Sequence, residues 1–108
     1  MLFSYLKNTL KDFGSNYFSN TNVVTKNIGF TANMNYLIIL SIKFDKDIAA
    51  VHMYIFTTAA DKDNYKFTPV TTNSPSDLLT YDGTNIKATL NENRWGTLSL
   101  IPIGYNDN

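Results

Sequence analysis

The residues best suited to acid–base or nucleophilic chemistry are few and scattered through the 108-residue chain. His52 is the only histidine, and the absence of cysteine removes thiolate nucleophiles, disulfides and cysteine-ligated zinc. His52 falls within an apolar run that has no nucleophile-elbow motif, which is typical of a packed or interface histidine. A carboxylate pair of Asp82 and Glu92 is the remaining hydrolase hypothesis, and Glu92 is the single Glu of the chain.

Acidic side chains gather in two short segments, Asp45–Asp47 and Asp61–Asn64, and these raise the question of a calcium site. In an EF-hand count from Asp61 the fifth position is Tyr65, and neither the central Gly nor the closing Glu follows. Acidic residues in such turns normally accept hydrogen bonds from their own backbone. We therefore expect no metal, no cofactor and no catalytic site, and hence a protein that is not an enzyme.

Aromatic residues make up 14% of the chain and are the remaining candidates for a binding role. Their rings combine an apolar face with a polar tip, so they can stack on a sugar or on a partner, although most are expected in a core or an interface. Trp95, the only Trp, follows an Asn-rich turn at the start of a strand and can cover one end of the fold. The candidate ligand-binding residues are Tyr81, Asp82, Trp95 and Tyr105.

Charge and hydropathy narrow the class of protein. Nine basic and nine acidic residues give a formal net charge of zero, whereas proteins that grip phosphate backbones normally carry a basic excess. The apolar run Tyr36–Ile42 is far too short to cross a bilayer, and the start of the chain lacks the features of a signal peptide. We expect a soluble protein with no nucleic-acid partner and no membrane insertion, and its neutrality mildly favours an assembled state.

The elements that must position these residues begin with an amphipathic helix, predicted over residues 2–18. Gly14 offers an early end, and the polar segment Ser19–Asn22 follows as a break. A helix this short needs cover for its apolar stripe, which its own domain, a membrane surface or a second copy would supply. Lys7 and Lys11 form only a thin basic face, which disfavours the membrane, whereas the apolar spacing matches a heptad seam for self-association. The seam consists of Phe3, Leu6, Leu10, Phe13 and Tyr17.

Strands and turns account for the rest of the chain. Tyr36–Phe44 shows the alternation of a half-buried strand, and Asp82–Gly83 is the strongest short-range hairpin signal. Ala49–Thr58 carries bulky side chains on both faces, which is expected of a central strand or of one that lies under a neighbouring subunit. Tyr54 and Phe56 on this strand are therefore assigned, with the helical seam, to an oligomer interface.

Short strands without crossover helices predict an all-β fold, an antiparallel, jelly-roll-like β-sandwich preceded by the N-terminal amphipathic helix. Residues 1–22 are expected to form the helical stem and a polar linker. Residues 23–108 are expected to form the sandwich as a head domain.

Three segments of this predicted sandwich resemble the β-sandwich tip or head domains of tailed-bacteriophage fibre proteins. FTANMNYLIILSI (Phe30–Ile42) is similar to the Asn-containing turn and long apolar strand that open those domains. AAVHMYIF (Ala49–Phe56) is similar to their strand in which small residues are followed by bulky ones. YDGTNIKATLNENRWGTLSLIPI (Tyr81–Ile103) resembles their closing hairpin. The resemblance covers residues 23–103 and has no invariant catalytic residue, and fibre proteins are usually far longer, with a shaft ahead of the tip.

The resemblance implies a homotrimeric structural protein of the virion, a fibre tip or decoration protein that contacts other virion proteins and recognises a receptor such as a host surface glycan. It would assemble in the host cytoplasm and become extracellular on the released virion. The alternative is a monomeric carbohydrate-binding β-sandwich module, which the aromatic residues and the Asn- and Asp-rich loops favour. A small hydrolase built on a carboxylate pair is the third hypothesis.

Overall fold

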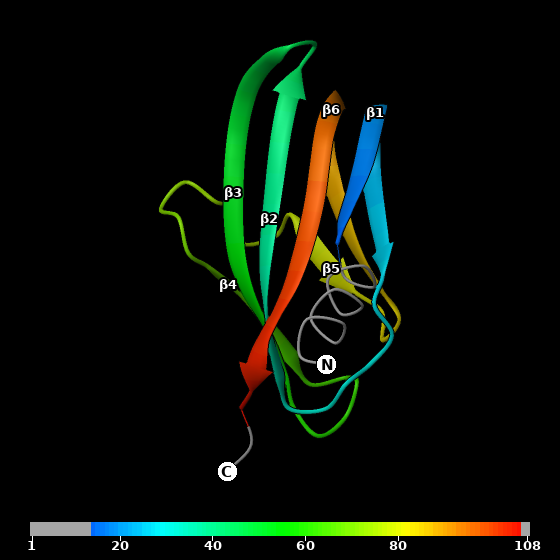
Figure 1. The fold of residues 1–108 in the computed structure, drawn as a ribbon, viewed down its shortest axis with the longest axis vertical. Helices are drawn as coiled ribbons and strands as arrows, with labels where there is room; N and C mark the ends of the chain where they lie inside the picture. The colour runs from blue at the N-terminus through cyan, green and yellow to red at the C-terminus, as the bar shows by residue number, and fades with distance from the viewer. Residues whose placement is uncertain (1–13, 107–108) are drawn as a thin grey trace, which may run out of the picture.

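The computed structural model describes residues 14–106, and within this range the chain forms six strands and no helix (Figure 1). The strands are β1 (Ser15–Asn27), β2 (Met34–Phe44), β3 (Asp47–Thr58), β4 (Tyr65–Pro69), β5 (Leu79–Tyr81) and β6 (Asn85–Tyr105). All pairs are antiparallel, in the order β1-β6-β2-β3-β4, with β5 added to β6. The expected all-β, antiparallel architecture is confirmed.

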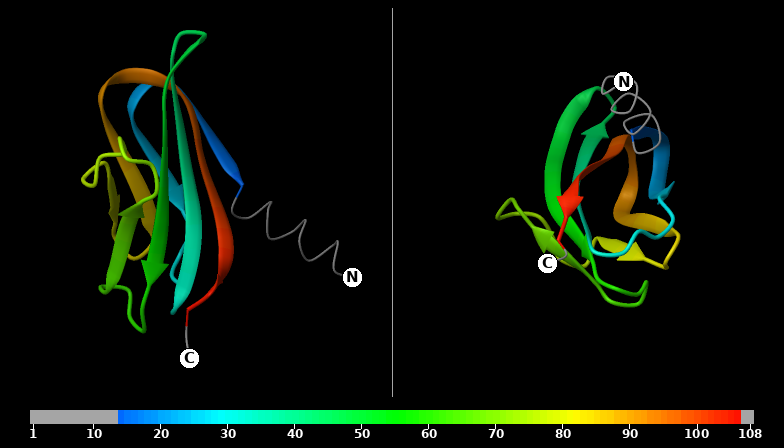
Figure 2. Two further views of the ribbon diagram at one scale, coloured as in Figure 1. Left: turned by 90° about the vertical axis from the view of Figure 1, so that its left-hand side faces the viewer. Right: turned by 60° about the horizontal axis from the view of Figure 1, so that its bottom comes forward.

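The sheet curls into a half-barrel because β6, which is 21 residues long, bends in its middle (Figure 2). Its first part pairs with β5 and with the end of β1, whereas its second part pairs with β2 and with the start of β1. At the bend the register with β1 shifts, so that Val23 lies opposite Thr89 but Thr21 lies opposite Arg94. The jelly-roll-like sandwich is not confirmed, because the six strands belong to one curled sheet.

The predicted N-terminal helix is contradicted over its last residues. The seam positions Phe3, Leu6, Leu10 and Phe13 lie outside the described residues. After Gly14 the chain is strand, and Tyr17 pairs with Thr97 of β6, so its assignment to a helix is wrong. The predicted break Ser19–Asn22 lies inside β1 at the register shift, where Asn20 adopts a φ of 51°. The backbone groups of β1 bond to β6 on both sides of this segment, and the extra residues at the register shift form a β-bulge.

The core fills the concave side of the half-barrel. On β2, β3 and the second part of β6 the even-numbered residues face it, as alternation requires. The largest fully buried side chains are Tyr36, Ile38, Leu40, Tyr54, Phe56, Thr58, Ile86, Leu98 and Leu100. Phe56 is the centre of an aromatic cluster, stacked on Phe67 at 4.6 Å between centroids and in edge contact with Tyr81 at 4.9 Å.

The predicted hairpin at Asp82–Gly83 is confirmed as the connection from β5 to β6. The Asp82 carboxylate accepts hydrogen bonds from the backbone N–H groups of Thr84 (2.9 Å) and Asn85 (2.7 Å). Gly83 adopts a φ of 93°, which favours glycine because a Cβ is strained there. The turn therefore owes its shape to these two residue types, as the sequence pattern indicates.

Candidate functional site

The face of the sheet that points away from the core is unusually apolar. Antiparallel sheets with one buried face normally present polar side chains on the other. Here Leu37 of β2 lies opposite both Ile55 of β3 and Ile101 of β6, and Ile39 lies opposite Met53. We call this surface the outer apolar face, and it consists of Leu37, Ile39, Val51, Met53, Ile55 and Ile101.

The outer apolar face is partly exposed, and its six side chains carry no charge. Val51 is 43% exposed, and Ile103, two residues beyond the end of the face on β6, is 55% exposed. The next positions on the same side are small and uncharged: Ser41 pairs with Val51, and Ser99 pairs with Ile39. The first charged side chain on this side of β2 is Lys43, opposite Trp95 near the end of the strand. The surface therefore suits burial against another apolar surface better than contact with a charged ligand.

A small aromatic and cationic cluster lies at the end of the sheet next to the β2–β3 connection. Phe44 and Trp95 meet edge to face at 6.5 Å between ring centroids, and Arg94 Cζ lies 5.1 Å from the Phe44 centroid. Arg94 also forms an ion pair with Glu92 at 3.0 Å. Phe44 is 59% exposed, so one aromatic surface at this end is available to a partner.

The structure separates the residues assigned to an oligomer interface. Tyr17 is 87% exposed on β1 and pairs with Thr97 of β6. Thr97 in turn lies opposite Ser41, which lies opposite Val51, so Tyr17 is at the margin of the outer apolar face. Tyr54 and Phe56, by contrast, are fully buried in the core of the single chain. The Tyr54 hydroxyl donates to the Pro75 carbonyl at 2.7 Å. These two side chains leave no surface for a neighbouring subunit to contact.

The four candidate ligand-binding residues are not brought together as one site. Tyr81 is buried in the aromatic cluster, with its hydroxyl hydrogen-bonded to the Gly29 carbonyl, and burial raises its pKa. The Asp82 carboxylate accepts hydrogen bonds from the backbone of its own turn. Trp95 pairs with the end of β2, whereas the exposed Tyr105 pairs with the start of β2, roughly 30 Å away at the rise of a strand.

Acidic residues within the described residues form no metal or carboxylate-pair site. Among residues 14–106 no three His, Asp or Glu side chains lie close enough to hold a metal ion. The Asp61 carboxylate accepts a hydrogen bond from the Asp63 N–H at 3.0 Å, which is the backbone capping expected of such a turn. Asp82 lies in the turn before β6 and Glu92 lies within β6, so a strand segment roughly 20 Å long separates them. No helix in the described part of the chain has the length and hydropathy to span a bilayer.

The outer apolar face was only half visible in the sequence. Val51, Met53 and Ile55 alternate with the core residues of β3, so a strand that is bulky on both faces was recognisable. On β2 the run YLIILSI places Leu37 and Ile39 on the second face, and such a continuous apolar run is the available signal. The alternation of apolar residues along the chain does not predict that β6 places Ile101 beside Leu37, because that pairing is remote in sequence.

Comparison with protein families, characterised proteins and solved structures yields no match to this chain. Its surfaces are therefore the basis on which a function is assigned.

Proposed function

We propose that the protein is a non-enzymatic structural protein that assembles as a homotrimer through its outer apolar face. The observation that carries this proposal is the row formed by Ile55, Leu37 and Ile101 across three strands, on the side of the sheet that the chain's own core does not cover. Three copies that turn this face toward a common axis would bury it. The interface thus lies on the sheet, not at Tyr54 and Phe56.

The physical argument is one of solvation and charge. Burying the remaining exposed area of each such side chain contributes on the order of 1 kcal/mol, and six side chains supply several times that. The formal net charge of zero means that copies do not repel one another as they approach.

The setting that we propose is a virion, as a fibre tip or decoration protein in contact with other virion proteins. This part rests on the resemblance of residues 23–103 to phage fibre domains and on the assembly-prone surface together. A monomeric carbohydrate-binding module is the second candidate. The separation of Tyr81, Asp82, Trp95 and Tyr105 gives it no support, and the observation that favours it is a groove between β3 and β6.

Light scattering coupled to size exclusion tests the assembly. The wild-type protein at micromolar concentration is expected to show three times the 12.2 kDa mass of one chain. Ile39→Lys and Val51→Lys place a charge on the outer apolar face and are expected to give monomers. Thr80→Lys is the matched control, because Thr80 is exposed on β5 away from this face, and it should remain trimeric.

Circular dichroism on the same samples separates dissociation from unfolding. Val51 is already 43% exposed, so its substitution should leave the strand signal intact. A wild-type protein that runs as a clean monomer would overturn the proposal. A trimer that persists in folded Ile39→Lys and Val51→Lys would place the interface elsewhere.

A further inference from the structure

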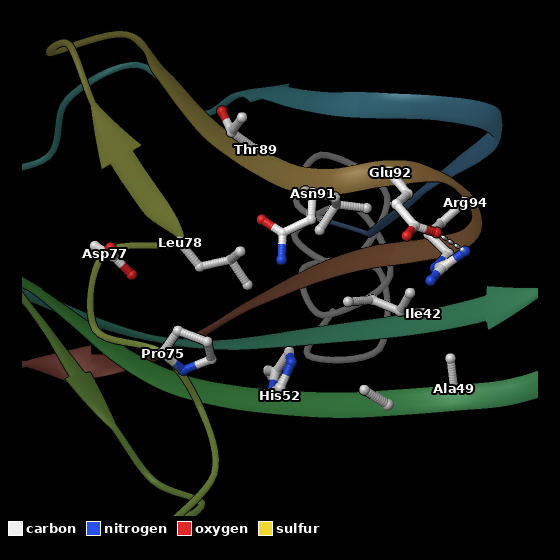
Figure 3. A pocket seen from close by; sticks show the side chains of 12 residues that line it. Ile42, Ala49, His52, Pro75, Asp77, Leu78, Thr89, Asn91, Glu92 and Arg94 are labelled. Atoms are coloured by element: carbon white, nitrogen blue, oxygen red, sulfur yellow. Dashed lines mark ion pairs between the residues drawn. The ribbon is translucent and has the colours of Figure 1, made fainter.

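A groove opens on the concave side of the half-barrel, between β3 and the bend of β6, with a volume of about 610 Å³ (Figure 3). The segment Pro75–Leu78, which leads into β5, closes one side of it. The space exists because β3 carries only methyl groups at Ala49 and Ala50, whereas Tyr54 and Phe56, the inward positions beyond His52, fill the core. The groove lies on the opposite side of the sheet from the outer apolar face.

The groove combines an apolar floor with hydrogen-bonding groups that have no partners. Ile42 and Leu90 line the floor from β2 and β6. The side chains of His52, Asp77 and Asn91 also line it, and none bonds to another group among residues 14–106. Asp77 and Asn91 are exposed to water, whereas His52 is half-buried. The Nδ1 atom of His52 is buried, and an unpaired buried nitrogen is costly unless something else bonds to it.

The charges around the groove disfavour an anionic ligand. Glu92 and Arg94 neutralise each other in their ion pair, and Asp77 supplies one further negative charge. Burial lowers the pKa of His52, so its imidazole is neutral at pH 7 and offers one donor and one acceptor. A small anion would meet the Asp77 carboxylate without a free cation to bind, because the guanidinium of Arg94 is already paired.

We propose that this groove binds a neutral saccharide. Sugar hydroxyls both donate and accept hydrogen bonds, so they can pair with the carboxylate of Asp77, the amide of Asn91 and the imidazole of His52. The C–H face of a pyranose can pack on the apolar floor. Phe44 lies outside the groove, but its exposed ring contacts Arg94, which lines the groove, so the ring can extend the contact surface for a sugar. A wholly apolar ligand would leave the buried Nδ1 atom of His52 without a partner. The site is independent of the proposed assembly, because a single copy contains all of these groups.

The test is a titration of the ¹⁵N-labelled protein with maltose, lactose and N,N′-diacetylchitobiose. At least one of these probes is expected to shift the amide resonances of Ala50, His52 and Asn91, with a dissociation constant on the order of 1 mM. Ala50→Leu fills the groove and Asp77→Asn removes its charged acceptor, and each is expected to weaken binding about tenfold. Ala60→Leu and Asp63→Asn are matched controls at exposed positions outside the groove and should bind as the wild type does.

Several results would overturn the proposal. One is the absence of shifts with all three sugars, and another is a set of shifts confined to residues outside the groove. Stronger binding of sialyllactose than of lactose would contradict a site for neutral sugars. A thermal melt shows whether Ala50→Leu is folded, and Asp77→Asn, a change at the surface, carries the test if it is not. The scattering measurement decides assembly separately, so failure of either proposal leaves the other measurable.

Discussion

Gly96 of β6 lies so close to Ser41 of β2 that a Cβ on the glycine would stand 1.9 Å from the Ser41 carbonyl oxygen. The same Cβ would lie 2.9 Å from Cζ of Phe18 on β1. Gly96 is therefore the point at which three strands converge, and its φ of 153° is one that other residues rarely adopt. The approach of β1 and β2 to β6 at this position depends on a missing side chain.

Gly96→Ala is expected to lower the free energy of unfolding by about 3 kcal/mol, because backbone atoms of β2 must move to admit the methyl group. Gly104→Ala is the control, since Gly104 has a similar φ of 148° but nothing within 4 Å of an added Cβ. Urea denaturation followed by circular dichroism measures both. Equal losses in the two variants would show that backbone strain, and not the contact with Ser41, sets the requirement for glycine.

Thr58 is a buried polar residue whose hydroxyl joins two segments. It accepts a hydrogen bond from the Met34 N–H at 2.9 Å and donates to the Thr31 carbonyl at 2.6 Å. Thr58→Val keeps the shape but leaves both backbone groups unpaired, so we expect a loss of about 2 kcal/mol in the free energy of unfolding. Thr80→Val, at an exposed strand position, should change stability by less than about 0.5 kcal/mol. Similar melting curves for the two variants would contradict this role.

Asp82 should make stability depend on pH in the acid range. The backbone N–H groups of Asn85 and Thr84 lower the pKa of its carboxyl below the ordinary value. A depressed folded pKa adds stability that is present above roughly pH 4 and is lost as the pH falls through the folded value. The wild type should therefore exceed Asp82→Asn in stability at neutral pH, and the difference should shrink in acid. A difference that does not change with pH would contradict the assignment.

Tyr54 should make stability fall as the pH rises in the alkaline range. Burial, and then the charge of Asp77, raise the pKa of Tyr54 to about 12. A raised folded pKa adds stability that is full below the ordinary value near 10 and is lost as the pH rises through about 12. Tyr54→Phe loses the bond to the Pro75 carbonyl, at a cost of about 1 kcal/mol at neutral pH. Denaturation at increasing pH should show the two proteins converging, and parallel curves would refute the expectation.

The salt dependence of assembly distinguishes an apolar interface from an ionic one. Ion pairs between subunits weaken as salt screens them, whereas the outer apolar face has no charge to screen. We expect the mass measured by light scattering to be unchanged between low salt and about 1 M NaCl, where the Debye length is about 3 Å. Dissociation in high salt would point to charged contacts outside Leu37 and Ile39.

The hairpin at Asp82–Gly83 and the alternation of Tyr36–Phe44 could be predicted because local chemistry decides them. The strand at Tyr17 could not, since its spacing from Phe13 is that of a helix and its partner Thr97 is distant in sequence. The groove was equally hidden, because it depends on Ala50 facing a bend of β6 that only the tertiary structure defines. Local patterns therefore identified strands, and long-range pairing decided the surfaces.

The position of β6 at the centre of the sheet governs when the protein can fold during synthesis. The hydroxyls of Ser15 and Ser99 lie 2.7 Å apart although 84 positions separate them in the chain. While the ribosome still holds β6, the β2–β3 hairpin cannot pair with it, and both apolar faces of the hairpin are open to water. The nascent chain must therefore remain unaggregated until β6 has emerged, as expected of folds whose contacts are remote in sequence.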